Sequence, residues 1–386
     1  MRDLTPKIAV KLAEGAYQIK DKILGGTYDT PALNDLSKDF DFNLSSNVVQ
    51  GISGSFMEHI FKHKTGFAVI GTGKKGGNYL GHTVIAIRGT NSKRDAVTDV
   101  HCGLSTSANN LPAHAGFNKT FNSIKPALNT YFTKNNTGPV HCVGHSLGGA
   151  LAHLTANWLS EKQSGRPINL YTFGAPRVGY ESFAIKTSNS LNKIYRSLHM
   201  GDPVPLLPFW PFVHTEGEYV LHAGTSISAS AHRMIGNAPG YIATVSAFKS
   251  YAAINKKTAN RHKTQVRLDY EKRHQANFTS QWAHRLGAAL LTLLQDTGYL
   301  HQIQHMVTNT LTFYDKVAML LTKITETSGQ YVEQQKGLLG HMLVFAGKGG
   351  VVITEMSYKF IRWVLSITLT KVGLVAGTAL TIGQMV

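Results

Sequence analysis

Cysteine is nearly absent from this sequence. Only Cys102 and Cys142 occur among its 386 residues, which excludes the framework of several disulfides that holds many small secreted proteins together. A single bridge between the two remains open, because cysteine spacing alone does not establish a pairing. Cys142 lies in an apolar run and is expected to be a small buried side chain.

Acidic residues are also in short supply. There are 22 Asp and Glu against 39 Lys and Arg, which gives a formal net charge of +17. A nucleic-acid-binding surface would explain this balance, but no nucleic-acid-binding module is recognisable and no nucleic-acid partner is expected. Attraction to anionic lipid headgroups, worth about 1 kcal/mol per basic residue near the surface, is the interpretation we favour. A solvated basic surface without a partner is the simpler alternative.

The N-terminus lacks the features of a secretory signal peptide. Residues Met1–Lys7 contain no apolar core of the kind that such a peptide needs. We therefore expect a protein that is secreted without a cleavable signal peptide and acts at a target-cell membrane. The alternative is a protein that stays in the cytoplasm or at the periphery of a membrane.

No cofactor or metal is expected. The Cys and His residues do not cluster with the spacing of a metal site. Gly71–Gly76 formally matches a dinucleotide-binding fingerprint, but that fingerprint requires a strand before it and a helix after it. Here the run lies between two strand-like segments, 67–70 and 81–87, so we predict a hairpin loop.

The most informative stretch that is present is Gly144–Gly149, with the sequence GHSLGG. It follows the strand-like run 140–143 and precedes 150–156, which has the composition of a helix. Strand, tight Gly-x-Ser-x-Gly turn and helix together are the arrangement of a nucleophile elbow. The flanking glycines are needed because a Cβ there would clash with the strand or the helix. Ser146 is therefore the predicted nucleophile, held in a strained backbone conformation.

A nucleophilic serine needs a base, and the base needs an orienting carboxylate. In α/β-hydrolases the chain order is serine, then Asp or Glu, then His. Asp202 follows the strand-like run 193–200 and is fixed by Pro203. We predict that Asp202 is the acid; the alternative is an ordinary Asp-Pro turn.

Three histidines after Asp202 are candidates for the base. His232 lies in a small-residue loop beyond the apparent strand 218–221, where a side chain can fold back over the serine, and it is the favoured candidate. His214 and His222 remain open, with His214 expected to support that strand. His145, beside the nucleophile, is expected to be structural.

The tetrahedral oxyanion needs two donors, one after the serine and one from an earlier loop. Leu147 supplies the first through its backbone N–H. The strand-like run 81–87 ends in Arg-Gly-Thr, so Thr90 is the predicted second donor through its backbone N–H and hydroxyl.

These motifs, in this order, resemble the class 3 lipases, the fungal-type lipases among the α/β-hydrolases. The resemblance spans roughly residues 5 to 245 and implies an α/β-hydrolase fold with a mostly parallel sheet. It also implies Ser146, Asp202 and His232 as the triad, with Thr90 and Leu147 as the oxyanion hole. The matching stretches are Ile87–Ser92, Ala113–Phe117, Gly144–Ala150, Thr172–Gly179 and Asp202–Pro208.

In that family the segment after the Arg-Gly-Thr turn is a short helical lid. Here the segment is 92–100, whose apolar residues fall at helical spacing. Such a lid would cover the serine in water and open on lipid. The predicted lid residues are Ser92, Arg94, Ala96, Val97 and Val100.

The character of the sequence changes near residue 250. Between residues 251 and 340 proline is absent, and basic, amide and apolar residues alternate as they do in helices. We predict several helices here, the first strongly basic, which form a cap over the catalytic domain or a surface for a partner. The basic residues are Lys256, Lys257, Arg261, Lys263, Arg267, Lys272 and Arg273. The predicted division is therefore a lipase-like domain (1–250), a basic helical region (251–340) and a hydrophobic helical tail (341–386).

The tail contains a long stretch with little charge. From Trp363 to Val386 only Lys371 is charged, and a membrane-spanning helix needs about 20 predominantly apolar residues. Thr, Ser and Gly dilute the stretch, so a buried helical hairpin is an equal alternative. A soluble form that later exposes this tail would reconcile the two.

The whole layout is similar to that of bacterial phospholipase effectors delivered by type VI secretion. That resemblance implies an antibacterial toxin and an immunity or inhibitor protein that blocks the active site. The predicted function is phospholipase A-type hydrolysis of membrane glycerophospholipids. The alternatives are a triacylglycerol lipase or esterase, a membrane-disrupting protein with a pore-forming tail, and an inactive lipase-like binding module. The oligomeric state is not predicted.

Overall fold

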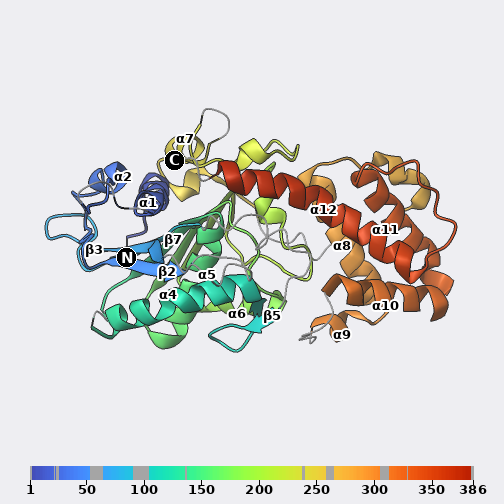
Figure 1. The fold of residues 1–386 in the computed structure, drawn as a ribbon, viewed down its shortest axis with the longest axis horizontal. Helices are drawn as coiled ribbons and strands as arrows, with labels where there is room; N and C mark the ends of the chain where they lie inside the picture. Colours follow the sequence, from blue (N-terminus) through green and yellow to red (C-terminus); the bar gives the residue numbers. More distant parts are fainter. Residues whose placement is uncertain are drawn as a thin grey trace.

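A mixed β-sheet and a set of helices form two units that lie side by side along the molecule (Figure 1). The computed structural model describes residues 2–20, 22, 26–52, 64–89, 104–134, 137–236, 240–257, 265–304, 313–327 and 329–383. We call the part built on the sheet, which contains the three residues predicted as a triad, the catalytic unit. The helices after residue 279 form the helical unit.

Within the described residues the sheet has nine strands, in the order β1-β3-β4-β7-β8-β9-β10-β11, with β2 also paired to β3. The central strands β4, β7, β8, β9 and β10 run parallel, and the strands toward both edges are antiparallel. The predicted α/β fold with a mostly parallel sheet is thereby confirmed. The strand bounds are β1 (Phe40–Asp41), β2 (Val48–Ile52), β3 (Lys64–Gly73), β4 (Thr83–Ile87), β7 (Val140–His145), β8 (Ile168–Phe173), β9 (Lys193–His199), β10 (Glu218–His222) and β11 (Asn255–Lys257).

Helices cover both faces of this sheet, and every residue of β4, β7 and β8 is buried. In β4, Ile85 and Ile87 point to the core that contains α4 and α5, while Val84 and Ala86 point to the core that contains α1 and α7. This alternation follows from the two-residue period of a strand. The helix bounds are α1 (Pro6–Gln18), α2 (Pro31–Asn34), α4 (Ala115–Lys134), α5 (Leu147–Lys162), α6 (Glu181–Ser190) and α7 (Tyr241–Ser246), with a small hairpin of β5 (Leu104–Thr106) and β6 (Pro112–His114).

The glycine-rich run at residue 71 lies where a hairpin was predicted. β3 and β4 pair antiparallel, with Gly71 opposite Val84. The connecting loop begins at Lys74, slightly later than expected, because Gly71–Gly73 still belong to β3. The segment is thus an ordinary sheet connection.

One predicted helix is wrong. Lys256 and Lys257 do not begin a basic helix but belong to β11, which pairs antiparallel with β10. The sheet therefore continues beyond the predicted boundary at residue 250. Lysines are common on edge strands, where they discourage pairing with other chains, and a run this short carries no periodicity that separates strand from helix. Lys272 and Arg273 also lie outside an α-helix, in a 3₁₀ turn (Tyr270–Gln275).

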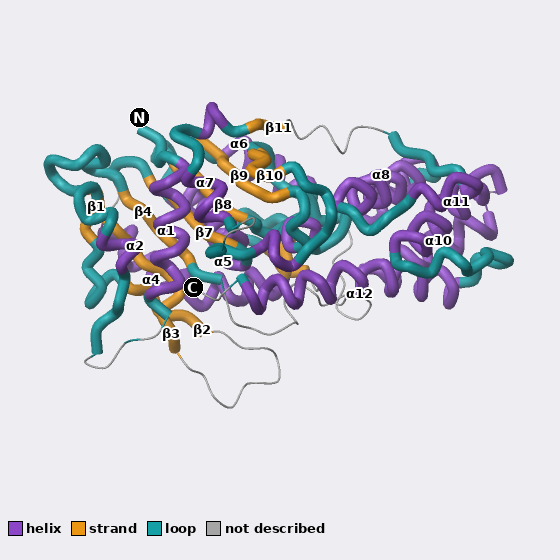
Figure 2. The backbone as a smooth tube through the Cα atoms, turned by 90° about the horizontal axis from the view of Figure 1, so that it is seen from above, coloured by secondary structure: helices purple, strands orange, loops and turns teal. Residues whose placement is uncertain are grey.

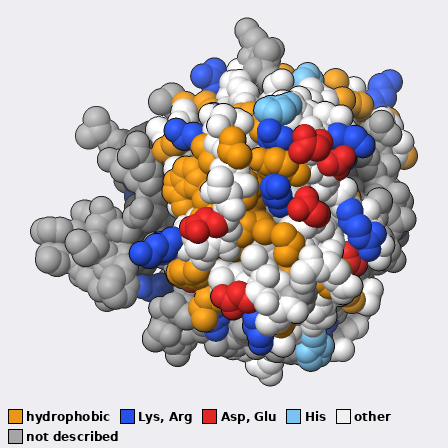
Figure 3. Space-filling model, turned by 90° about the vertical axis from the view of Figure 1, so that its right-hand side faces the viewer, with side chains coloured by type: hydrophobic (Ala, Val, Ile, Leu, Met, Phe, Trp, Pro, Cys, Tyr) orange, Lys and Arg blue, Asp and Glu red, His pale blue; other side chains and the backbone are white. Residues whose placement is uncertain are grey.

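The helical unit contains α8 (Ser280–Asp296), α9 (Leu300–Gln304), α10 (Phe313–Thr327), α11 (Val332–Phe345) and α12 (Tyr358–Ile382). Thr279 caps α8 by accepting a hydrogen bond from the Trp282 backbone N–H. The predicted boundary at residue 340 falls inside α11. At the far end of this unit a group of hydrophobic side chains lies among basic and acidic ones (Figure 3).

Helix α12 joins the two units. It packs against α10 and α11, and then runs to the catalytic unit, where it contacts the turn η2 (Ala229–His232). Both views of the backbone show this crossing (Figures 1 and 2). Among the described residues it is the one helix long and apolar enough to span a membrane, and half of its most apolar window is buried.

Candidate active site

Ser146 sits at a sharp turn between β7 and α5, as the sequence predicts. Its backbone has φ 59° and ψ −134°, a region that non-glycine residues rarely occupy and that is typical of strained functional residues. A Cβ added to Gly144 would lie 2.2 Å from the carbonyl oxygen of Gly148, and one added to Gly148 would lie 2.2 Å from that of Ile87. Both glycines are therefore required for the helix to start this close to β4 and β7.

Three side chains from separate parts of the chain meet at this turn. His232 Nε2 lies 2.8 Å from Ser146 Oγ, and His232 Nδ1 lies 2.8 Å from Asp202 Oδ2. A carboxylate only accepts hydrogen bonds, so Nδ1 carries the proton and Nε2 is free to accept from the serine hydroxyl. Asp202 follows β9 and His232 ends η2, and all three residues are buried. The arrangement has the geometry of a serine nucleophile, a general base and an orienting acid.

The other two candidate bases lie elsewhere. His214 Nε2 donates to the carbonyl oxygen of Pro205 at 2.8 Å, and burial together with nearby Arg196 and Arg177 holds its pKa well below the usual value. The exposed His222 accepts a hydrogen bond from the Gly224 backbone N–H. Of the three candidates, His232 is the one that the structure brings to Ser146.

Asp202 has two further hydrogen-bond donors. The Tyr241 hydroxyl donates to Asp202 Oδ2 at 2.7 Å, and the Val204 backbone N–H donates to Oδ1 at 2.9 Å. Burial and the nearby Asp202 charge raise the pKa of Tyr241, so its hydroxyl stays protonated and keeps donating. No motif marked Tyr241 in the sequence, because it reaches the triad from α7 and only the fold brings it there.

His145 supports the backbone of the base. Its Nε2 lies 3.0 Å from the His232 carbonyl oxygen, its Nδ1 lies 2.9 Å from the Tyr17 hydroxyl, and its ring stacks on that of His232. A carbonyl only accepts, so Nε2 carries the proton and Nδ1 accepts from Tyr17. Burial, and next the neighbouring His232, hold the pKa of His145 well below its usual value. His145 is thus a neutral link between α1 and η2.

One of the two predicted oxyanion donors is visible. Leu147 begins α5, and the first N–H groups of a helix have no partner within it. Thr90 lies outside the described residues, as do all five predicted lid residues and Cys102. The turn before Thr90 is anchored next to the elbow, because buried Arg88 donates to the carbonyl oxygens of Gly66 and Gly89. A Cβ on Gly89 would lie 3.6 Å from the Gly148 nitrogen.

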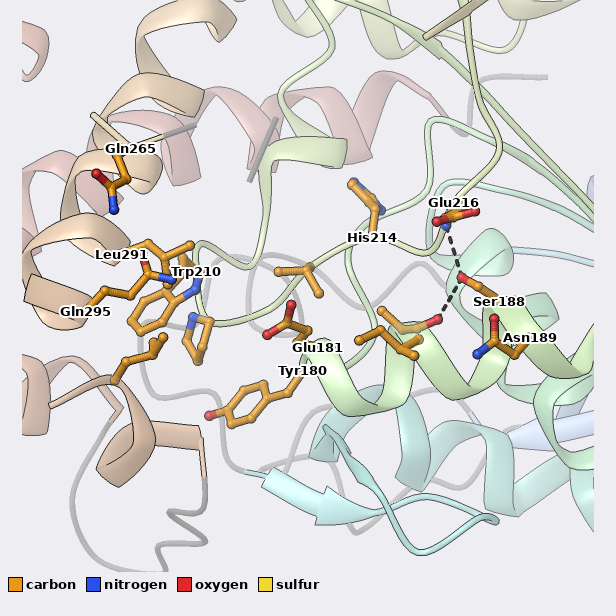
Figure 4. A pocket seen from close by; sticks show the side chains of 15 residues that line it. Tyr180, Glu181, Ser188, Asn189, Trp210, His214, Glu216, Gln265, Leu291 and Gln295 are labelled. Carbon is orange, nitrogen blue, oxygen red and sulfur yellow. Dashed lines mark hydrogen bonds between the residues drawn. The ribbon is translucent and has the colours of Figure 1, made fainter. Parts of the chain in front are cut away.

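A cavity of about 500 Å³ lies away from this site, between α6 and the helical unit (Figure 4). Glu181 and Ser188 of α6 line one side, and Gln295 of α8 lines another. The triad residues are not among those that line it.

The geometry agrees with what comparisons with known proteins find. The family described as "Lipase (class 3)" matches residues 84–212. A secreted mono- and diacylglycerol lipase of Fusarium solani is 36% identical over 149 residues, which cover 36% of this chain and 44% of the relative. A lipase of Rhizopus niveus is 33% identical over 153 residues, 37% of this chain and 39% of the relative. The chain thus spans less than half the length of either relative.

Solved structures of fungal lipases are also similar to this chain. Lipase II from Rhizopus niveus is 24% identical, covers 57% of this chain and 81% of its own, and has a TM-score of 0.43. The matched region 84–212 contains the strand before the Arg-Gly-Thr turn, the elbow with Ser146, and Asp202. Over this region the chain is therefore similar to the class 3 lipases.

Proposed function

We propose that this protein is a serine carboxylic-ester hydrolase that acts on glycerolipids. The observation that carries the proposal is the continuous hydrogen-bonded series from Ser146 Oγ through the His232 imidazole to the Asp202 carboxylate, with both distances at 2.8 Å. A neutral imidazole in this position removes the serine proton as the hydroxyl attacks, which is what nucleophilic acyl transfer requires.

The reaction follows from these positions. Ser146 Oγ attacks the ester carbonyl, its proton moves to His232 Nε2, and the tetrahedral oxyanion accepts a hydrogen bond from the Leu147 N–H. Collapse breaks the bond to the alkoxide, which takes the proton from His232 and leaves as an alcohol. Water then attacks the acyl-enzyme with His232 as base, and a fatty acid is released while the serine is regenerated. The Asp202 charge stabilises the imidazolium in both halves.

Acylglycerols are the first choice of substrate. The similar proteins bear the names mono- and diacylglycerol lipase and lipase, which supports the predicted alternative, a triacylglycerol lipase or esterase, over a phospholipase A. Phospholipids are the second choice, since a net charge of +17 attracts anionic headgroups. An antibacterial effector role, action outside the producing cell and an immunity partner are further proposals that rest on the sequence layout alone.

A headgroup comparison distinguishes the two substrate classes. Purified protein is mixed with detergent-dispersed dioleoylglycerol, trioleoylglycerol or mixed-acyl phosphatidylglycerol, with Ser146→Ala alongside, and the released fatty acids are identified. We expect Ser146-dependent release that is fastest from the acylglycerols. Faster release from phosphatidylglycerol would instead establish a phospholipase. No release above that of Ser146→Ala from any lipid would overturn the proposed function.

Substitution of Tyr241 tests whether Asp202 depends on its hydrogen bond from the Tyr241 hydroxyl. Tyr241→Phe removes the donor to Asp202 Oδ2, and a hydrogen bond to a charged group is worth about 1.5–3 kcal/mol. We expect kcat to fall at least about tenfold with KM unchanged, because Tyr241 positions the acid and touches no substrate. Tyr251→Phe, in the same apolar cluster and away from the triad, is the control. Equal kcat values for the two variants would mean that Asp202 does not depend on Tyr241.

A further inference from the structure

The last turn of α12 lies directly on the predicted base. A Cβ built on Gly383 would be 2.8 Å from His232 Cδ2 and 3.4 Å from His232 Nε2. The imidazole edge that faces Ser146 is therefore in contact with the end of this helix. Only a residue without a side chain fits there while the imidazole keeps its place.

Helix α12 also contacts the two segments that adjoin His232 and Asp202. The helix packs against η2, which carries His232, and against η1 (Val204–Leu206), which follows Asp202. His232 is 0% exposed, Asp202 is 1% exposed and Ser146 is 2% exposed. A substrate carbonyl must come within bonding distance of Ser146 Oγ, so no ester reaches the serine while these residues are covered.

The outward face of α12 is unusual for a helix in water. A surface helix normally carries charged residues on its solvent side, but here Trp363 and Leu374 are 39% and 65% exposed. From Trp363 to Ile382 the one charged residue is Lys371, which lies over the ring of Phe278.

Two of the exposed hydroxyls on that face are satisfied inside the helix. The hydroxyl of Thr378 donates to the carbonyl oxygen of Leu374, and that of Thr381 donates to the carbonyl oxygen of Gly377. Hydroxyls bonded to their own helix cost less to move out of water than free ones. The helix has 25 residues, long enough to reach across a bilayer or to lie along its surface, and contains no acidic residue.

We propose that the outward face of α12 binds a lipid bilayer, and that this binding draws its last turn off His232. Contacts between α12 and lipid replace the contacts between α12 and the catalytic unit. Ser146 then becomes accessible at the lipid surface, where the substrate is. The surface of this basic chain favours anionic lipid. The proposal rests on the proposed function, because the readout is ester hydrolysis.

The experiment uses the full chain and a soluble ester, p-nitrophenyl butyrate, with or without vesicles of ether-linked phosphatidylglycerol, which contain no cleavable ester. A covered form that dominates leaves an open minority of about 0.1–10%. We therefore expect the vesicles to raise kcat/KM of the natural chain by at least about tenfold. An unchanged rate would overturn the proposal.

Substitutions on the two faces of α12 distinguish its contact with His232 from its binding of lipid. Ala379 and Ala376 are buried on the side of Gly383, and Ala379→Asp or Ala376→Asp should raise the rate without vesicles toward the stimulated value. Ala376 lies one turn further from the imidazole than Ala379. Ala376→Asp therefore controls for a direct effect of the new charge on His232. Leu374→Asp should stay at the low rate when vesicles are added, because it places a charge on the face that enters lipid.

The control is Met319→Asp, which adds the same charge at an exposed position of α10. Its kcat/KM should equal that of the natural chain both with and without vesicles. Thermal unfolding of each variant establishes that it is folded. If no protein hydrolyses the ester under any condition, the proposed function fails. If all of them hydrolyse it equally, the hydrolase function stands and α12 is a fixed structural helix.

Discussion

Replacing Ser146 or His232 with alanine should lower kcat by about 10⁵- to 10⁶-fold, the largest effect expected of any substitution in this chain. Ser146 and His232 act as one unit, because the hydroxyl is a poor nucleophile without the base and the base has no proton to remove without the hydroxyl. The double variant should therefore be no slower than either single variant. Asp202→Asn should cost about 10⁴-fold, because an amide at that position no longer fixes the tautomer that accepts the serine proton.

His222→Ala is the matched control for this series. It removes a histidine that the sequence left open as the base, yet His222 is exposed and bonds to Gly224, so kcat should not change. The measurement is single-substrate kinetics on a soluble ester at saturating concentration. Loss of activity in His222→Ala, with His232→Ala still active, would show that the assignment of the base is wrong.

The free energy of unfolding should fall steeply as the pH drops below 6.5. Burial lowers the pKa of His114 to about 4, and burial lowers that of His141 and His153 to about 3; His145 and His214 are shifted in the same direction. These groups are neutral when folded and take up a proton when the chain unfolds. The unfolded chain therefore binds more protons between its histidine pKa near 6.5 and the folded values, and stability is lost as pH falls through that window.

The size of the effect is large because several histidines act together. At pH 5 each of His114, His141 and His153 contributes about 2 kcal/mol of destabilisation, and the three together reach the lower end of the whole stability of a typical domain, about 5–15 kcal/mol. Urea unfolding at a series of pH values measures the slope. His153→Gln should reduce that slope by one bound proton, or about 1.4 kcal/mol per pH unit. A flat profile between pH 7 and 5 would show that the buried histidines are already charged in the folded chain.

The parts of the site that were predictable are those whose requirements are local. Ser146 is specified by its two glycines, which the backbone needs wherever a helix starts that close to a strand. Asp202 is specified by a strand end and a proline. His232 was one of three histidines, and it was favoured only because a loop beyond the last long strand can fold back over the elbow.

Other features depend on contacts between distant segments and leave no local signal. Tyr241 reaches Asp202 from a separate helix, at a sequence separation of 39 residues. Gly383 touches His232 from the far end of the chain, and a glycine after an apolar helix looks like any helix end. The tail presented two alternatives, a membrane span and a buried hairpin, because an apolar helix has the same composition in either place. The basic segment at Lys256 was misassigned because three residues of edge strand are too few to show a period.

The position of α12 in chain order affects how the protein is made. Every element of the triad is complete once β11 has been synthesised, whereas α12 follows more than one hundred residues later. At about 5–20 residues per second, the catalytic unit emerges from the ribosome roughly ten seconds before the helix that covers it. Each newly made molecule therefore has an interval in which all three triad residues have been synthesised and α12 has not.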